Sequence, residues 1–217
     1  MDPGPARPVN PLPRSLEAER LDDEALDESL AAVLAGNPRD EAIWLFAYGS
    51  LMWNPELDFD ARHVGTLYGY HRNFCLWSRI NRGTPQRPGL VLTLERGGSC
   101  KGLLYRLQRD SAAAGLRRLW RRELTLGSYH PRWLGCSGAD GARYRALAFV
   151  SNTRCSGYAG KLPMERMVDA LATAAGKFGT SAEYLFRTQE TLSAHGIRDA
   201  RVERLVKMVR ARVSGSA

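Results

Sequence analysis

The sequence has few residues of the kinds that build metal centres, disulfide frameworks or membrane spans. Its 217 residues include four cysteines and four histidines, which lie far apart without a C-x-x-C pair or zinc-ligand spacing. No apolar run is long enough to cross a bilayer, and residues 1–14 contain no apolar segment typical of a secretory signal. These absences predict free thiols, no metal site and a cytoplasmic protein.

Positive charge is in excess: the chain has 31 lysines and arginines against 23 acidic residues, which gives a net charge of +8. Such an excess is found in proteins that bind nucleic acid, anionic lipid or an anionic small molecule. The arginines are spread along the chain, and no RNA-binding signature or basic region with heptads accompanies them. We therefore expect a solvated basic surface with no nucleic-acid or membrane partner, which salt-sensitive binding to random RNA or DNA would contradict.

The first 40 residues differ in composition from the rest of the chain. Residues 1–13 are rich in proline, which predicts disorder, and residues 15–34 have a helical pattern that Ser15 can cap. We predict a tail and a helix in residues 1–40, followed by one domain in residues 41–213 with no internal repeat.

The pattern of the remaining chain is strands first, one helix among them, and helices at the end. Strand patterns cover residues 43–48, 62–78, 90–95, 100–107, 129–137 and 143–150, and helical patterns cover 111–126, 163–176, 181–195 and 198–213. A glycine turn at 96–99 predicts that 90–95 and 100–107 form a hairpin. Gly65 and Gly69 predict bends or close packing within the long strand. The prediction is an α+β domain with a small curled sheet or barrel and flanking helices.

The stretch from Trp44 to Trp53 is the first candidate for a binding loop. An apolar, aromatic run ends at Ala47, and Tyr48, Gly49 and Ser50 interrupt it. A glycine without Cβ permits a turn and a close approach by another molecule. Backbone N–H groups that lose their strand partners there could bind an anionic group. An ordinary corner between a strand and a turn explains the same residues.

Glu123 is the candidate for acid–base chemistry. On a helix at about 100° per residue, it falls within the apolar stripe that contains Leu119 and Trp120, while the neighbouring arginines lie opposite. A carboxylate that faces a core responds by raising its pKa, which suits a general base or acid. The alternative is that Glu123 lies at the core edge and pairs with an arginine. Glu95 precedes a turn and is expected in solvent, and Glu183 is expected to fix its helix.

Short motifs in one order run through about residues 43 to 210. They are Trp44–Trp53, Val64–Gly65, Gly69–Arg72, Phe74–Ser78, Arg82–Pro85, Pro88–Leu92, Gly97–Cys100, Trp120–Glu123 and Ala182–Phe186. In these motifs the chain resembles the ChaC-like branch of the gamma-glutamylcyclotransferase superfamily. The resemblance implies a compact β-barrel with flanking helices, which agrees with the pattern of strands and helices.

The resemblance also implies site residues. Glu123 matches the catalytic glutamate, which follows an arginine at the end of a helix. The substrate loop corresponds to Ala47, Tyr48, Gly49, Ser50, Leu51 and Met52. Tyr158 is similar to a tyrosine that contacts substrate, Arg72 is a further candidate for substrate binding, and Arg82 and Tyr129 are weaker ones. Most ChaC-like sequences have glycine where this chain has Ala47, which leaves open a change in the loop because alanine excludes backbone angles that glycine permits.

The activity that the resemblance implies is conversion of glutathione to 5-oxoproline and cysteinylglycine. The α-amine of the γ-glutamyl group attacks its own γ-carbonyl, so the enzyme needs a proton shuttle, for which Glu123 is the candidate, and no metal, nucleotide or other cofactor. Two alternatives stay open: a cyclotransferase for another γ-glutamyl amine, and a non-catalytic binding protein on the same scaffold. The sequence does not determine the oligomeric state.

Overall fold

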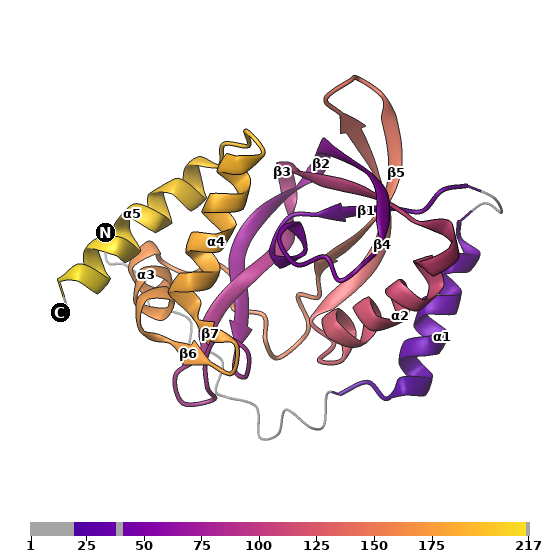
Figure 1. Cartoon of the computed structure of the whole chain (residues 1–217). Helices are drawn as coiled ribbons and strands as arrows, with labels where there is room; N and C mark the ends of the chain where they lie inside the picture. Colours follow the sequence, from indigo (N-terminus) through magenta and orange to yellow (C-terminus); the bar gives the residue numbers. More distant parts are fainter. Residues whose placement is uncertain (1–19, 38–40, 216–217) are drawn as a thin grey trace, which may run out of the picture.

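Five strands form a closed barrel in the order β1-β3-β2-β4-β5 (Figure 1). The structure is a computed structural model that describes residues 20–37 and 41–215. The first strand closes the barrel by pairing antiparallel with β3 and parallel with β5. The barrel strands are β1 Trp44–Ala47, β2 Phe59–Ser78, β3 Gly89–Leu107, β4 Tyr129–Gly138 and β5 Arg143–Ser151. The predicted curled sheet or barrel is confirmed.

Helices cover the barrel in two groups on opposite sides (Figure 1). One group contains α1 Asp23–Ala35 and α2 Arg109–Leu124. The other contains α3 Met164–Thr173, the short strands β6 Ala175–Gly176 and β7 Gly179–Thr180, α4 Ser181–Ala194 and α5 Ala200–Ser214. The fold class is therefore α+β, as predicted. Within the described residues, no helix is both long and apolar enough to cross a bilayer.

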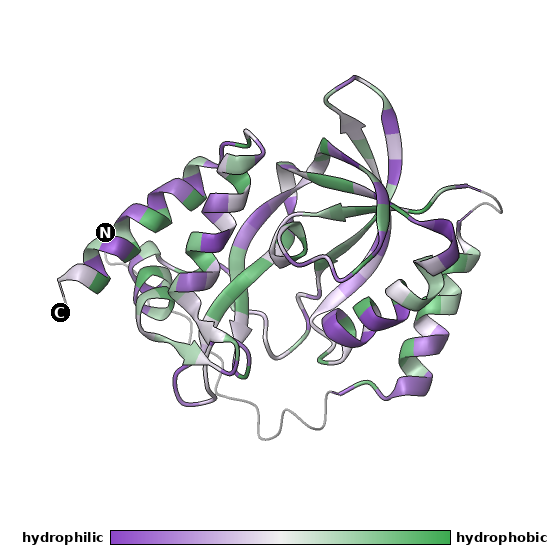
Figure 2. Ribbon diagram, viewed as in Figure 1, coloured by the Kyte–Doolittle hydropathy of each residue, from purple (hydrophilic) through white to green (hydrophobic). Residues whose placement is uncertain are grey.

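The core lies inside the barrel and beneath both groups of helices, where apolar residues concentrate (Figure 2). The largest fully buried side chains include Trp120, Tyr105, Phe46, Phe74 and Phe149. The rings of Trp120 and Phe149 lie 5.4 Å apart and join α2 to β5. Burying one large apolar side chain contributes about 1.5–3 kcal/mol, so this contact fixes the helix that carries Glu123.

The long ribbon of β2 and β3 differs from the predicted pairing. Residues 90–95 and 100–107 do not form a hairpin, because both lie in β3 and both pair with β2. The pairing shifts register where Gly97 and Gly98 lie opposite Gly69, and all three have positive φ. The glycines therefore make a bulge that bends a two-stranded ribbon. The predicted bend at Gly69 is confirmed.

The first helix begins later than predicted. Residues 20–22 are not helical, and the side chain of Asp22 caps α1 by accepting from the Ala25 N–H at 2.8 Å. The predicted cap at Ser15 and the predicted disorder of residues 1–13 lie outside the described residues. Helix α1 packs against the domain, because Leu26 and Leu30 belong to the core.

Candidate active site

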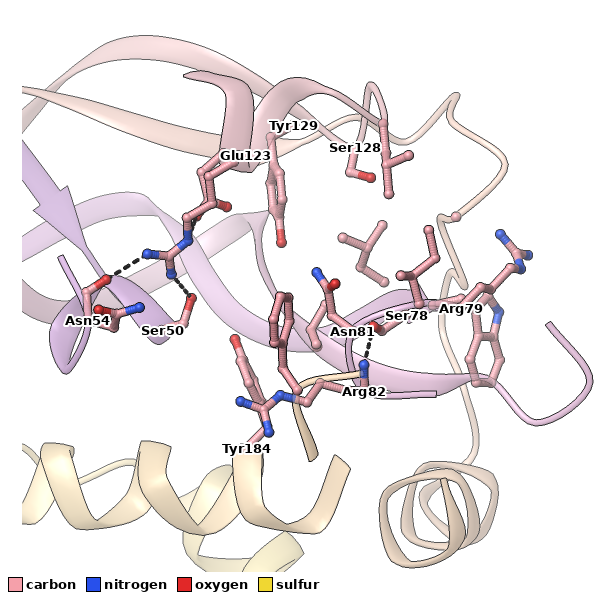
Figure 3. A pocket seen from close by; sticks show the side chains of 18 of the residues that line it. Ser50, Asn54, Ser78, Arg79, Asn81, Arg82, Glu123, Ser128, Tyr129 and Tyr184 are labelled. Carbon is pink, nitrogen blue, oxygen red and sulfur yellow. Dashed lines mark hydrogen bonds and ion pairs between the residues drawn. The ribbon is translucent and has the colours of Figure 1, made fainter. Parts of the chain in front are cut away.

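A cavity of about 880 Å³ opens where the end of α2, the loop after β1, the loop after β2 and α4 meet. Its lining includes Ser50, Ser78, Arg82, Glu123, Tyr129 and Tyr184. Figure 3 shows Glu123, Tyr129 and Tyr184 arranged around this space from three different elements. The volume is in the range of small-molecule sites.

Glu123 lies in the last turn of α2, and its side chain is 14% exposed. Burial raises the pKa of this carboxyl above its ordinary value, the Arg122 guanidinium opposes that rise, and the negative Glu56 reinforces it. The Nε atom of Arg122 lies 3.1 Å from Oε1 of Glu123. The sequence pattern suggested either a carboxyl with a raised pKa or one paired with an arginine, and Glu123 has both properties.

Arg122 links the end of α2 to the loop after β1. Its guanidinium donates to the Asn54 carbonyl at 2.7 Å and to Oγ of Ser50 at 2.9 Å (Figure 3). A third contact, with Glu56, measures 3.1 Å. The helical pattern places Arg122 away from the core, but the long side chain reaches back over Glu123. It therefore fixes the carboxylate and the loop relative to each other.

The loop after β1 forms a short 3₁₀ turn, Ser50–Met52. The N–H of Met52 donates to the Gly49 carbonyl at 2.9 Å, so the N–H groups of Ser50 and Leu51 precede the first hydrogen bond of the turn. A Cβ at Gly49 would lie 3.1 Å from the Tyr184 hydroxyl. The absence of a Cβ at Gly49 therefore permits the close approach of the Tyr184 side chain. From the sequence we had expected it to permit the approach of a ligand.

Three tyrosines near Glu123 are held by backbone groups. The hydroxyl of Tyr48 donates to the Phe149 carbonyl at 2.7 Å, and that of Tyr129 donates to the Leu92 carbonyl at 3.0 Å. The Leu92 N–H donates to the Tyr184 hydroxyl at 3.4 Å. Burial, with the Glu123 charge as a lesser cause, raises the pKa of all three, in Tyr184 to about 12. Near neutral pH they are therefore uncharged donors.

Four residues singled out by the sequence line the cavity, namely Ser50, Glu123 and the weaker candidates Arg82 and Tyr129. The other members of the predicted loop, Ala47, Tyr48, Gly49, Leu51 and Met52, are buried. Ala47 ends β1 opposite Leu103 as an ordinary strand residue. These buried residues shape the loop from beneath, and Ser50 presents it to the cavity.

Arg72 and Tyr158 do not line this cavity. The buried guanidinium of Arg72 donates to the Tyr48 carbonyl at 2.6 Å, to the Lys101 carbonyl at 2.7 Å and to Asp199 at 2.7 Å. Arg72 thus holds the start of the loop from behind. The hydroxyl of Tyr158 donates to Glu95 in a second cavity. The expectation that Glu95 faces solvent was wrong, because its side chain is 13% exposed.

Tyr184 and the clamping role of Arg122 were missed from the sequence. Tyr184 belongs to the motif Ala182–Phe186, and its neighbour Glu183 closes a capping box with Thr180 at the start of α4. The structural role expected of Glu183 is thus confirmed. The capping box fixes the residue at which α4 begins. Tyr184 follows Glu183 directly, and its hydroxyl lies beside Gly49 of the loop after β1. Among the described residues, no group of three or more His, Cys, Asp or Glu is placed to hold a metal ion.

The chain resembles known proteins in both fold and sequence. The fold is shared with a solved yeast gamma-glutamyl cyclotransferase specific to glutathione, with a TM-score of 0.74 and 18% identity over 79% of this chain and 97% of that one. The ChaC-like protein family matches residues 43–212. The chain belongs to the ChaC-like family.

Curated relatives support this membership. The chain is 40% identical over 171 residues to the glutathione-specific gamma-glutamylcyclotransferase of Escherichia coli, covering 79% of this chain and 74% of that protein. It is 32% identical over 165 residues to the human glutathione-specific gamma-glutamylcyclotransferase 1, covering 74% and 73%. The family match over residues 43–212 includes every residue that lines the cavity.

Proposed function

We propose that this protein is a glutathione-specific gamma-glutamylcyclotransferase that converts glutathione to 5-oxoproline and cysteinylglycine. The observation that carries the proposal is the Glu123 carboxyl, which lies on the cavity wall with a raised pKa, clamped by Arg122 to the glycine loop. Membership of the ChaC-like family and the names of its curated relatives support the same reaction.

Glu123 acts as the proton shuttle in the proposed mechanism. Its carboxylate takes a proton from the α-ammonium of the γ-glutamyl group, because a protonated amine is not a nucleophile. The freed amine attacks the γ-carbonyl, a new C–N bond closes the five-membered lactam, and the C–N bond to cysteine breaks. Glu123 gives this proton to the leaving nitrogen and then carries a second proton from the attacking nitrogen to the same amine. The lactam keeps one N–H, cysteinylglycine leaves with an ammonium group, and Glu123 is again a carboxylate. A carboxyl with a raised pKa suits both transfers.

The rest of the cavity positions the substrate. Backbone N–H groups of the loop at Ser50 and Leu51 are candidate donors to the α-carboxylate or to the oxyanion of the tetrahedral intermediate. Arg82, whose side chain is largely buried at the cavity wall, supplies a cation for a substrate carboxylate. Tyr129 adds a neutral hydroxyl. Holding the γ-glutamyl chain in a folded conformation contributes a proximity term.

The proposal includes no metal or other cofactor, and its compartment is the cytoplasm. A cyclotransferase for another γ-glutamyl amine would use the same loop and the same carboxylate. That alternative differs only in the leaving half of the substrate, toward which the loops at Ile80 and Phe178 extend the cavity.

The test is to incubate the purified protein with glutathione and with a panel of γ-glutamyl amino acids, and to follow 5-oxoproline by mass spectrometry. We expect turnover with glutathione to exceed that with every other member of the panel, and to survive EDTA. Preference for a different γ-glutamyl amine would select the alternative substrate. No 5-oxoproline from any of them, with a folded protein, would contradict the catalytic proposal.

A further inference from the structure

A second cavity, of about 1000 Å³, lies on the barrel and shares no lining residue with the Glu123 cavity. It is bounded by β2 and β3, by β4 and β5, by the loop after β5 and by the start of α5. The proposed reaction uses none of its residues. Its inner wall is made by polar side chains from three strands, Asn73, Glu95 and Ser151.

Asn73 is 5% exposed, and one of its two polar atoms has no partner. Its side-chain nitrogen donates to Oε2 of Glu95, and its oxygen, Oδ1, accepts no hydrogen bond. Exchanging the two atoms would place an amide oxygen against a carboxylate, so Glu95 fixes this orientation. A buried acceptor without a donor destabilises the protein, and an N–H group of a ligand would supply the missing hydrogen bond.

The carboxylate of Glu95 adds a negative charge beside that acceptor. It receives hydrogen bonds from Tyr158 and Asn73, and Nε2 of His71 lies 3.9 Å away. Burial raises its pKa, but these donors together outweigh burial and the net pKa is lowered. The Cys75 thiol is a third donor to Glu95. An ionised carboxylate has about four acceptor positions, so three hydrogen bonds leave one for a cation. The buried hydroxyl of Ser151 also has no partner.

The outer part of the cavity has the opposite charge. Arg132, Arg154, Lys161 and Arg201 line it, and all four are exposed at the rim. They come from β4, from the loop after β5 and from α5, so the tertiary structure alone brings them together. A cluster of cations at a cavity mouth attracts carboxylates, and arginine binds them through paired N–H groups.

We propose that this second cavity binds a small zwitterion, an amino acid or dipeptide. Its ammonium group lies against Glu95 and Oδ1 of Asn73, and its carboxylate lies among the arginines of the rim. An anion alone would leave the inner acceptors unsatisfied, and a cation alone would leave the rim unused. The site is distinct from the Glu123 cavity and does not depend on the reaction proposed there.

The experiment is a titration of isotopically labelled full-length protein followed by NMR. The probes are glycine, β-alanine, γ-aminobutyrate and glycylglycine, in which the ammonium and carboxylate groups are progressively further apart or joined by a peptide bond. Glycinamide lacks the carboxylate and N-acetylglycine lacks the ammonium. We expect at least one zwitterion to shift the side-chain amide signal of Asn73 at millimolar concentration, and both blocked probes to bind at least tenfold more weakly. Comparing the affinities of the three amino acids with that of glycylglycine shows which separation of ammonium and carboxylate the cavity prefers.

Three variants test the position of the site. Arg154→Glu changes only an exposed rim residue and should weaken binding about tenfold or more, and Asn73→Leu should abolish it. Glu123→Gln should leave the affinity unchanged. The proposal is overturned if no zwitterion shifts Asn73, if a blocked probe binds as well as its parent, or if Arg154→Glu has no effect. Should Asn73→Leu fail to fold, the Arg154→Glu result decides.

Discussion

Glu123 and Glu95 are two carboxylates with almost the same exposure, 14% and 13% of the side chain, and opposite pKa shifts. The pKa of Glu123 is raised, and that of Glu95 is lowered. Burial disfavours the ionised form in both. Burial acts more strongly on Glu123, and the surroundings add to the difference. Glu123 has one arginine and a nearby acid, whereas Glu95 accepts from a tyrosine, an amide and a thiol, with a histidine close by.

The exposed fraction of a side chain therefore does not by itself identify a proton-transfer group. A buried carboxylate that receives several hydrogen bonds stays ionised and is suited to binding a cation. A buried carboxylate with few donors has a pKa closer to neutral and is suited to exchanging protons. On this basis we propose that Glu123 exchanges protons in one cavity and that Glu95 binds a cation in the other.

The largest expected effect belongs to Glu123→Gln. Gln keeps the shape of the side chain and cannot take a proton, so turnover of glutathione should fall about a hundredfold or more. The free energy of unfolding should hold or rise, because a costly buried charge is gone. Steady-state kinetics and thermal denaturation of the one variant measure both. If the folded variant forms 5-oxoproline at the rate of the parent protein, Glu123 does not have the proposed catalytic role.

Arg122→Met tests the clamp between Glu123 and the loop. Removing the cation should raise the pKa of Glu123 further, so the acid limb of kcat/KM should move to higher pH, because only the ionised carboxylate is a base. Loss of the contacts with Ser50 and Asn54 should lower kcat/KM about tenfold.

Two other arginine variants are the controls for that prediction. Arg122→Lys keeps the charge and should return the acid limb toward its original pH. Arg121→Met removes the neighbouring exposed arginine, which pairs with Asp23 at 3.0 Å. It should change neither the pH profile of kcat/KM nor its value. An acid limb that stays in place in Arg122→Met would mean that this arginine does not set the pKa of Glu123.

Glu95→Gln should leave turnover near the parent value and lower the free energy of unfolding by about 1–3 kcal/mol. An amide oxygen cannot replace both carboxylate oxygens, so Tyr158 or Asn73 loses its acceptor. The lowered pKa sets the pH dependence: the contribution of Glu95 is present above the unfolded pKa, near 4.5, and is lost as pH falls through the folded pKa.

The two glutamates should therefore give opposite pH dependences in denaturant unfolding. The deficit of Glu95→Gln should shrink as the pH falls below about 4.5. For Glu123 the folded pKa is raised, so ionisation costs stability. The advantage of Glu123→Gln should grow as pH rises from the unfolded pKa, near 4.5, to the folded pKa, and then stay constant. Parallel pH profiles for the two variants would refute the comparison.

The smallest effect concerns the contact between Gly49 and Tyr184. Gly49→Ala places a methyl group 3.1 Å from the tyrosine hydroxyl, which should raise KM a few fold and cost about 1 kcal/mol of stability. Adding Tyr184→Phe removes the hydroxyl and should recover about half of that cost. A double-mutant cycle by denaturant unfolding and kinetics gives the coupling. Strictly additive effects would show that the loop accommodates the methyl group elsewhere.

The sequence predicted the fold where patterns are long and local. Period-2 and helical patterns located β2, β4, β5 and the helices α2 to α5, and the order of elements gave the α+β class. It failed at β3, because a glycine pair between two strand patterns fits a hairpin turn and a bulge equally well. Only pairing with β2, a non-local contact, distinguishes them. The N-cap of α1 at Asp22 was missed for a similar reason, since several polar residues there can cap a helix.

The candidate site was predictable in part. The carboxylate on the apolar stripe of α2 and the glycine loop were both visible in the sequence, and the structure places Glu123 and Ser50 in one cavity. Tyr158 and Arg72 carried no signal of their direction, and the structure places both outside it. Their hydrogen bonds to Glu95 and Asp199 join residues 63 and 127 positions apart in the chain.

By itself, the sequence determined which residue types lie on most strands and helices. It thereby determined the α+β class and the carboxylate that faces inward from α2. The tertiary structure decided what each carboxylate meets. Glu123 meets an arginine and an apolar wall, whereas Glu95 meets the hydroxyl and amide of residues from other elements. Side-chain periodicity is set by local backbone geometry, but a pKa is set by neighbours in space, and those are chosen only when the strands close into the barrel.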